Sequence, residues 1–306
     1  MKTTSDVIQS ASVHLAALTG HVFDLLTISK PISPEAAVNL AKVVSKLSPL
    51  LGNLIEFNTV AFLNAQKEYQ DYGKWKRQDP GFPDTIFSSA IQPSPGFEIK
   101  AWFPLATEIT ARFKDSQNHF QEDQTYVCLL AWLPDQLIYG KPTIIDVCIV
   151  SGMSVAKARD THYHNPPDYL VMEPEDTTAR TRNLQQTNTN GYKWQGTPEQ
   201  FRDAQAVVAS WGRNTLPYQP TPEYQAKLRE LIARYPYRLD TNFAKINRIN
   251  HAEITAFKHK VLNAEHHGKT IREWARLLGR GNETKLQEAL EDNLGIKEAD
   301  SEDSVQ

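Results

Sequence analysis

Cysteine is scarce in this chain, with only two among its 306 residues. Two thiols cannot form a disulfide framework or a zinc site with four thiolate ligands. Both of them, Cys128 and Cys148, lie in apolar runs, which favours buried free thiols. The sequence also lacks an apolar run of the roughly 18 residues that cross a bilayer, and its beginning, MKTTSDVIQSAS, lacks the hydrophobic stretch of a signal peptide. We therefore expect a cytoplasmic protein.

Two common catalytic motifs are missing as well. The sequence has no glycine-rich loop of the kind that binds phosphates in P-loop enzymes, and no G-x-S-x-G motif of the α/β-hydrolases. Apolar residues nevertheless make up 40% of the chain, which is enough for a sizeable core and excludes disorder throughout. We expect a folded protein whose chemistry uses other residues.

Charge is unevenly distributed, although the net charge is only −3. Residues 178–287 contain 18 Lys and Arg against 9 Asp and Glu, whereas the rest of the chain is acidic. A basic block of this kind is often an ordinary solvated surface, but it also suits a polyanion such as nucleic acid. Charge alone leaves both interpretations open.

The spacing of apolar residues predicts helices at the start of the chain. They recur at helical spacing up to Lys30, where a proline follows. A second helix is expected after Ser33 as its N-cap, with Pro34 in the first position. Pro49 and Gly52 predict a break or kink within this second helix.

Short runs rich in aromatic and β-branched residues indicate strands between residues 82 and 150. We expect them near 85–90, 97–103, 125–132 and 143–150, with a helix between the second and the third. Further helical patterns cover 199–211, 223–235, 252–263 and 270–278. The sequence therefore predicts an α/β fold, in which a mixed sheet is flanked by helices and has helical additions at both ends.

These patterns divide the chain into four parts. A helical region, 1–66, contributes to the core, and the predicted sheet with a polar segment after it occupies 67–196. A basic helical region follows at 197–292. The remaining residues, 293–306, are acidic and are expected to form a disordered tail.

The segment from Pro83-Asp84 to Glu98-Ile99-Lys100 is the strongest candidate site. Because side chains alternate along a strand, Glu98 and Lys100 should share one face while Ile99 points to the core. Two carboxylates, Asp84 and Glu98, make a hard oxygen site suited to Mg²⁺, which takes further ligands from water and phosphate. An ammonium beside that site can hold an attacking water and neutralise charge that develops on a phosphodiester.

The alternative is a purely structural role for these residues. The pattern of an acid two residues before a lysine occurs twice in the chain, at Glu98 and at Glu283, and chance gives about as many. Asp84 could cap a turn and Lys100 could extend from an edge strand. In addition, a tight turn at 93–96 would place Asp84 well beyond Glu98 along a regular hairpin, so that a bend or bulge would be needed.

Pro83-Asp84, the Glu98-Ile99-Lys100 strand and the acid Glu56 on a preceding helix resemble the PD-(D/E)xK nuclease superfamily, and within it the type II restriction endonucleases. The resemblance covers about residues 50–150. It implies a restriction-endonuclease-like fold and Mg²⁺-dependent cleavage of double-stranded DNA by a homodimer. Asp84 and Glu98 would be metal ligands, Lys100 the catalytic lysine and Glu56 an auxiliary acid, and the helical residues 5–63 offer apolar surface for the dimer.

A polar segment, residues 177–195, is the candidate for base recognition. It contains no acid, and its Arg, Lys, Asn and Gln side chains can pair with base edges in the major groove. The candidate readers are Arg180, Arg182, Asn183, Gln185, Gln186, Asn188, Asn190 and Lys193. A solvated loop or ribbon remains the alternative. Two other functions stay open: a repair or non-specific nuclease with the same core, and a non-enzymatic DNA-binding regulator that uses the C-terminal helices.

Overall fold

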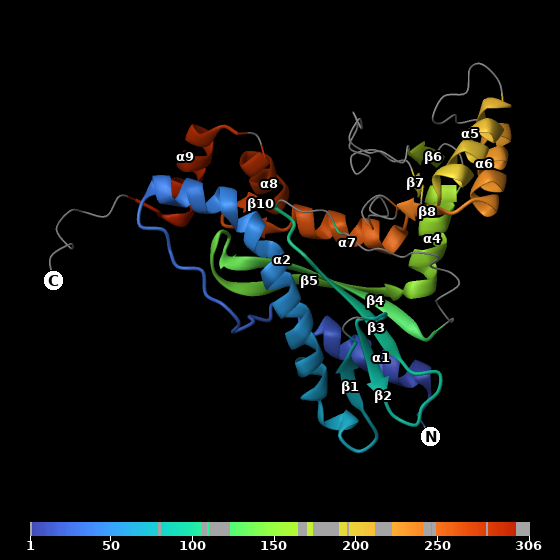
Figure 1. Ribbon diagram of the computed structural model, residues 1–306. Helices are drawn as coiled ribbons and strands as arrows, with labels where there is room; N and C mark the ends of the chain where they lie inside the picture. Colours follow the sequence, from blue (N-terminus) through green and yellow to red (C-terminus); the bar gives the residue numbers. More distant parts are fainter. Residues whose placement is uncertain are drawn as a thin grey trace. The chain divides into compact units, whose positions relative to one another are not determined.

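The computed structural model describes residues 2–78, 81–105, 109, 123–164, 170–173, 190–194, 196–211, 222–240, 246, 249–279 and 281–297 (Figure 1). The chain forms two compact units. The first comprises Met1–Ile109, Phe120–Val155 and His251–Gln306, and the second comprises Thr110–His119 and Ala156–Asn250. The predicted basic region 197–292 is therefore divided between them. No helix in the described ranges is long and apolar enough to cross a membrane.

The first unit contains a five-stranded mixed sheet that is curled like half a barrel and flanked by helices. Only β3 and β4 are parallel, and the other neighbouring strands are antiparallel. The strands follow one another in sequence order: β1 (Lys74–Arg77), β2 (Thr85–Ser88), β3 (Gly96–Trp102), β4 (Thr125–Gln136) and β5 (Tyr139–Ser151). Strand β3, which carries the candidate motif, is therefore the central strand of this sheet.

The four predicted strands are confirmed, and β1 is an additional one. The sequence KWKR of β1 gives little strand signal because three of its four residues are charged and exposed. Only Trp75 is buried there, against Phe87 of β2 and Phe97 of β3. The helix expected between the second and third predicted strands lies outside the described residues.

Helix α1 (Thr4–Ala16) ends earlier than its apolar pattern predicts. The chain after it runs along the edge of β5 instead of continuing as a helix. There Gly20 N donates to Ile144 O at 2.8 Å, Phe23 N donates to the carbonyl of residue 142 at 2.8 Å, and Ile28 N donates to the carbonyl of residue 140 at 2.9 Å. These bonds pair backbone groups of β5 that an open sheet edge would leave unpaired. Because the residues after α1 form hydrogen bonds with this distant strand, they do not continue the helix.

Of the break or kink predicted at Pro49 and Gly52, the break does not occur, because helix α2 (Pro34–Asn64) is continuous. The predicted cap is confirmed, since the Ser33 side chain accepts a hydrogen bond from Ala36 N. Pro49 cannot donate to the carbonyl of Ser45 one turn earlier, but the Ser48 hydroxyl donates to that carbonyl at 2.7 Å. The helix therefore passes the proline with this acceptor satisfied, and its ribbon changes direction partway along its length (Figure 1).

Three further helices lie in the described part of the first unit: α7 (Ala252–Asn263), α8 (Ile271–Gly279) and α9 (Glu283–Leu294). Helix α7 packs against β5 and α9 packs against α2, where Lys42 Nζ lies 2.6 Å from the carboxylate of Glu283. Short pieces lie between the longer elements, namely η1 (Lys67–Tyr69), β9 (Glu265–His266) and β10 (Lys269–Thr270). The start of the predicted disordered tail is wrong, because α9 extends to Leu294 and Ile296 is buried, and residues 298–306 lie outside the described part of the chain.

In its described ranges, the second unit contains a three-stranded sheet and three helices, one of which begins in the first unit. Strand β7 (Asn190–Trp194) lies between the parallel β6 (Leu170–Glu173) and the antiparallel β8 (Tyr237–Asp240). Trp194 packs in a core with Ala204, Leu228 and Leu231. These come from the two predicted helices, α5 (Pro198–Ala209) and α6 (Pro222–Arg234), whereas α4 (Gly152–His164) begins in the first unit.

Candidate active site

Asp84, which directly precedes β2, lies opposite Glu98 of the antiparallel strand β3. The register pairs Thr85 with Phe97, and one further step places Asp84 across from Glu98. The strands are not joined by a tight turn at 93–96, because β2 ends at Ser88 and the connection to β3 takes up all residues from 89 to 95. This longer connection sets the register, and a bulge is not needed to bring the two carboxylates together.

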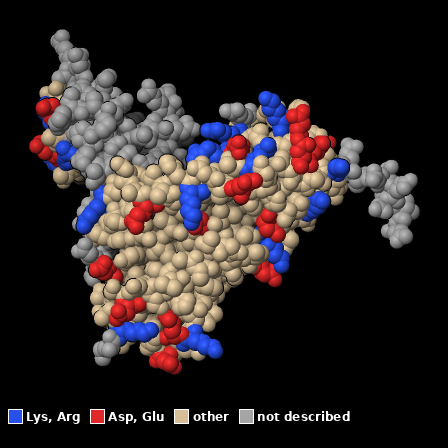
Figure 2. All heavy atoms as spheres, turned by 180° about the vertical axis from the view of Figure 1, so that it is seen from behind, with Lys and Arg blue, Asp and Glu red and all other residues tan. Residues whose placement is uncertain are grey.

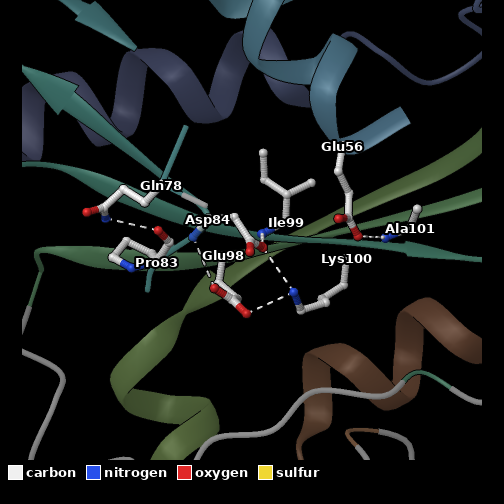
Figure 3. A network of polar contacts seen from close by, with 8 residues as sticks. All are labelled: Glu56, Gln78, Pro83, Asp84, Glu98, Ile99, Lys100 and Ala101. Carbon is white, nitrogen blue, oxygen red and sulfur yellow. Dashed lines mark hydrogen bonds and ion pairs between the residues drawn. The ribbon is translucent and has the colours of Figure 1, made fainter. Parts of the chain in front are cut away.

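The predicted alternation along β3 is confirmed. Phe97 and Ile99 are fully buried in the core. Figure 3 shows Ile99 on one side of the strand and Glu98 and Lys100 on the other. The site is more enclosed than an open face would be, since the side chains of Glu98, Lys100 and Asp84 are 10%, 21% and 28% exposed, respectively. The central place of β3 in the sheet accounts for this burial.

Lys100 joins the two carboxylates. Its Nζ lies 2.9 Å from Glu98 Oε1 and 3.0 Å from Asp84 Oδ2 (Figure 3). Main-chain groups fix the acids as well, because Ile99 N donates to Asp84 Oδ2 at 2.8 Å and Asp84 N donates to Glu98 Oε2 at 3.2 Å. Each carboxylate thus has one oxygen in contact with the ammonium and at least one backbone donor, which holds the three side chains in one arrangement.

Gln78 supports the loop that carries Asp84, a role that the sequence did not reveal. Its side-chain Nε2 donates to Pro83 O at 3.0 Å and its backbone N donates to Asp84 O at 2.9 Å. Gln78 follows β1 directly and lies across from Asp84 in the β1–β2 register. A prediction of β1 would have pointed to Gln78, but the sequence pattern did not predict that strand.

Glu56 reaches β3 from α2, on the side of the strand where Ile99 lies (Figure 3). Its Oε1 accepts a hydrogen bond from Ala101 N at 3.2 Å. Burial raises the pKa of Glu56 to about 7, although the Lys100 charge and the Ala101 hydrogen bond oppose the shift. The structure therefore places Glu56 beside the strand of the cluster, where it braces the backbone next to Lys100.

Burial and the neighbouring charges shift the pKa values of Glu98 and Lys100 in opposite directions. Burial raises the pKa of Glu98, while Lys100 and the Asp84 hydrogen bond work to lower it. For Lys100, burial lowers the pKa, but Glu98, Asp84 and Glu56 together raise it above its ordinary value. Lys100 is therefore a cation at neutral pH, so it can donate hydrogen bonds and neutralise negative charge but cannot act as a base.

The donor set fits Mg²⁺ in type. In the described ranges, no three His, Cys, Asp or Glu side chains are placed to hold a metal ion together. Asp84 and Glu98 supply two facing carboxylates, and Mg²⁺ is usually held by one or two carboxylates together with waters and substrate phosphates. Both acids are also bonded to Lys100, so a metal would share these oxygens with the ammonium or take the second oxygen of each group.

Most of the predicted recognition segment lies outside the described residues, including Arg180, Arg182, Asn183, Gln185, Gln186 and Asn188. Asn190 and Lys193 belong to β7. In the first unit, Lys260 of the basic block 178–287 has its Nζ 2.8 Å from Asp146 Oδ1. Figure 2 shows scattered Lys and Arg side chains around a broad uncharged area, so the coloured part of this face offers no continuous basic surface.

Comparison with protein-family models, with curated proteins and with solved structures finds no match to this chain. The geometry of Asp84, Glu98 and Lys100 is therefore the basis for a functional proposal.

Proposed function

We propose that the protein is a Mg²⁺-dependent endonuclease that hydrolyses phosphodiester bonds of double-stranded DNA at specific sequences, with a restriction-endonuclease-like core. One observation carries the proposal: two carboxylates face each other across β2 and β3, and a lysine that remains charged joins them. This arrangement combines a hard oxygen site with a cation, which suits an anionic phosphodiester.

Each residue has a role that follows from its contacts. Asp84 and Glu98 would hold Mg²⁺, which supplies Lewis acidity toward the phosphate and a more acidic bound water. Lys100 would orient the attacking water by donating a hydrogen bond, and would neutralise charge on the phosphate as the transition state forms. Glu56 would keep β3 in place through Ala101 N, and Gln78 would hold the backbone of Asp84.

Sequence specificity and a dimeric assembly belong to the same proposal. The acid-free, amide-rich segment 177–195 supplies the residue types that read base edges. Cleavage of both strands at one site by a chain with a single centre calls for two chains related by a twofold axis. We therefore propose a homodimer that binds double-stranded DNA.

The test is a digest of a large sequenced DNA with the purified chain and Mg²⁺, Mn²⁺, Ca²⁺ or EDTA. We expect discrete fragments with Mg²⁺ or Mn²⁺, and binding without cleavage with Ca²⁺, which accepts looser geometry. Asp84→Asn, Glu98→Gln and Lys100→Ala should each abolish cleavage. Glu283→Gln and Lys285→Ala are matched controls, because they alter the second acid-x-lysine pair, which lies on α9, and they should cleave normally.

The same digest separates the other two functions. Cleavage that yields a smear would identify a non-specific or repair nuclease with the same cluster. DNA binding without cleavage in any of the metals would identify a regulator, in which Lys100 only neutralises two structural acids. Normal cleavage by all three site variants would remove the nuclease proposal.

A further inference from the structure

Helix α2 carries a second apolar stripe besides the one that it buries. Its core face consists of residues such as Ala41, Val44, Leu51 and Ile55. The second stripe repeats with alternating steps of three and four residues and comprises Leu40, Val43, Leu47, Leu50, Leu54, Phe57 and Ala61. This spacing, which averages 3.5 residues, is the pattern with which one helix packs along another.

The second stripe is exposed. Val43, Leu50 and Phe57 are 44%, 55% and 57% exposed, and Ala61 is exposed as well, while Leu40, Leu47 and Leu54 are half-buried. Within the first unit, α2 lies at the front of Figure 1 with no described element drawn before it. The Arg77 guanidinium lies over the Phe57 ring at 5.8 Å and leaves most of that ring open. A contiguous apolar stripe of this length is a candidate contact site.

We propose that the stripe binds the same stripe of a second copy of this chain, with the two α2 helices antiparallel and a twofold axis beside Leu50. The stripe is self-complementary in this arrangement, as a twofold interface requires. Leu47 meets Leu54 of the other copy, the small Val43 meets the large Phe57, and Leu40 meets the small Ala61.

Charge also favours the antiparallel direction. Lys42 and Lys46, the exposed basic residues of α2, both lie in its N-terminal half, where Lys42 is also paired with Glu283 of α9. A parallel pair would bring these lysines of both copies to the same end, whereas an antiparallel pair keeps them apart. Like charges in close contact are unfavourable, so the antiparallel pair is preferred.

The size of the stripe sets the strength of the contact. From residue 40 to residue 61 the helix is about 32 Å long, and at a width of about 10 Å it covers roughly 300 Å² on each copy. Stable dimers usually bury about 800 Å² per partner. The stripe alone therefore gives a weak dimer that dissociates on dilution.

The dimer also determines how far the two candidate active sites lie from the twofold axis. This step alone rests on the nuclease proposal. Glu56 precedes Phe57 and touches β3 beside Lys100. It lies about 9 Å along the helix from the twofold axis, at 1.5 Å per residue. The dimer would thus hold both centres near the axis, as cutting of two strands requires.

Cysteine cross-linking in the full chain tests the arrangement without DNA or metal, so its result is independent of any cleavage activity. Leu50→Cys should form a disulfide-linked dimer under mild oxidation, because residue 50 faces its own copy. Ala61→Cys alone should not, but a mixture of Leu40→Cys and Ala61→Cys chains should cross-link. The unchanged chain controls for Cys128 and Cys148. Self-cross-linking of Ala61→Cys, or none by Leu50→Cys, would overturn the proposal.

Sedimentation velocity over a range of concentrations provides the second measurement. The unchanged chain should shift from monomer toward dimer as concentration rises, and Leu50→Glu should remain monomeric with an unchanged circular dichroism spectrum. Val13→Glu is the matched control, since Val13 is an exposed apolar residue on α1, outside the stripe, and its loss should leave the dimer intact. A monomer at every concentration, or a dimer that Leu50→Glu does not weaken, contradicts the stripe as an interface.

Discussion

Replacing Glu56 with glutamine should make the protein more stable at alkaline pH. The burial of Glu56 raises its pKa to about 7, well above the ordinary value of 4.5. A buried carboxyl of this kind prefers to be neutral in the folded state. Glu56→Gln keeps the shape and the oxygen that accepts from Ala101 N, but it never carries a charge, so the cost of a buried carboxylate disappears.

The size of the effect follows from the two pKa values. Below pH 4.5, Glu56 is neutral in the folded and the unfolded chain, and the variant and the parent should be equally stable. As pH rises from there through 7, the unfolded chain loses the proton first, so the parent loses free energy of unfolding. At 1.36 kcal/mol per pKa unit the full difference is about 3 kcal/mol, an upper limit because the glutamine NH₂ also needs a partner.

Urea denaturation at pH 5, 6, 7 and 8 in EDTA measures this difference. The gap between Glu56→Gln and the parent should open as pH rises and level off above pH 7. Glu288→Gln, which removes an exposed glutamate of α9, controls for the loss of one negative charge and should show no such trend. A gap of the same size at pH 5 and at pH 8 would refute the assignment of the effect to the ionisation of Glu56.

Three further changes should have distinct outcomes in the same denaturation assay. Lys100→Met leaves two facing carboxylates without their cation and should cost about 3 kcal/mol at pH 8, and less at pH 5, where protons can replace the lysine. Ile99→Ala opens a cavity on the core face of β3 and should cost about 2 to 5 kcal/mol while Mg²⁺-dependent cleavage, if present, persists. Ser48→Ala removes the donor to Ser45 O and should cost about 1 kcal/mol, but clearly less in a Pro49→Ala background, where the backbone can supply the hydrogen bond.

Local patterns in the sequence predicted most of the secondary structure. The predicted strands and the helices 199–211, 223–235 and 252–263 correspond to elements in the structure, because their apolar residues alternate or recur within one short segment. The errors arise where contacts with a segment far away in the sequence determine the local structure. The end of α1 depends on hydrogen bonds to β5, and β1 exists because Trp75 joins a cluster with Phe87 and Phe97.

The continuity of α2 shows a different limit of prediction from the sequence. A proline inside a helix removes one donor, and the sequence alone therefore predicted a break or a kink. The preceding residue, Ser48, supplies a replacement donor within the same turn. The pattern Ser-Pro was visible in the sequence, but a serine before a proline also occurs in turns, so the residue types do not decide between the two conformations.

The candidate site combines both kinds of information. Strand alternation was enough to place Glu98 and Lys100 on one face of β3, because that property depends on one segment. The position of Asp84 depends on the register between β2 and β3, and therefore on how many of the connecting residues belong to a strand. A shorter connection would have moved Asp84 along the ladder and away from Lys100. The residues of the candidate site could thus be identified from the motif. Their contact with one another, in contrast, is a property of the folded sheet.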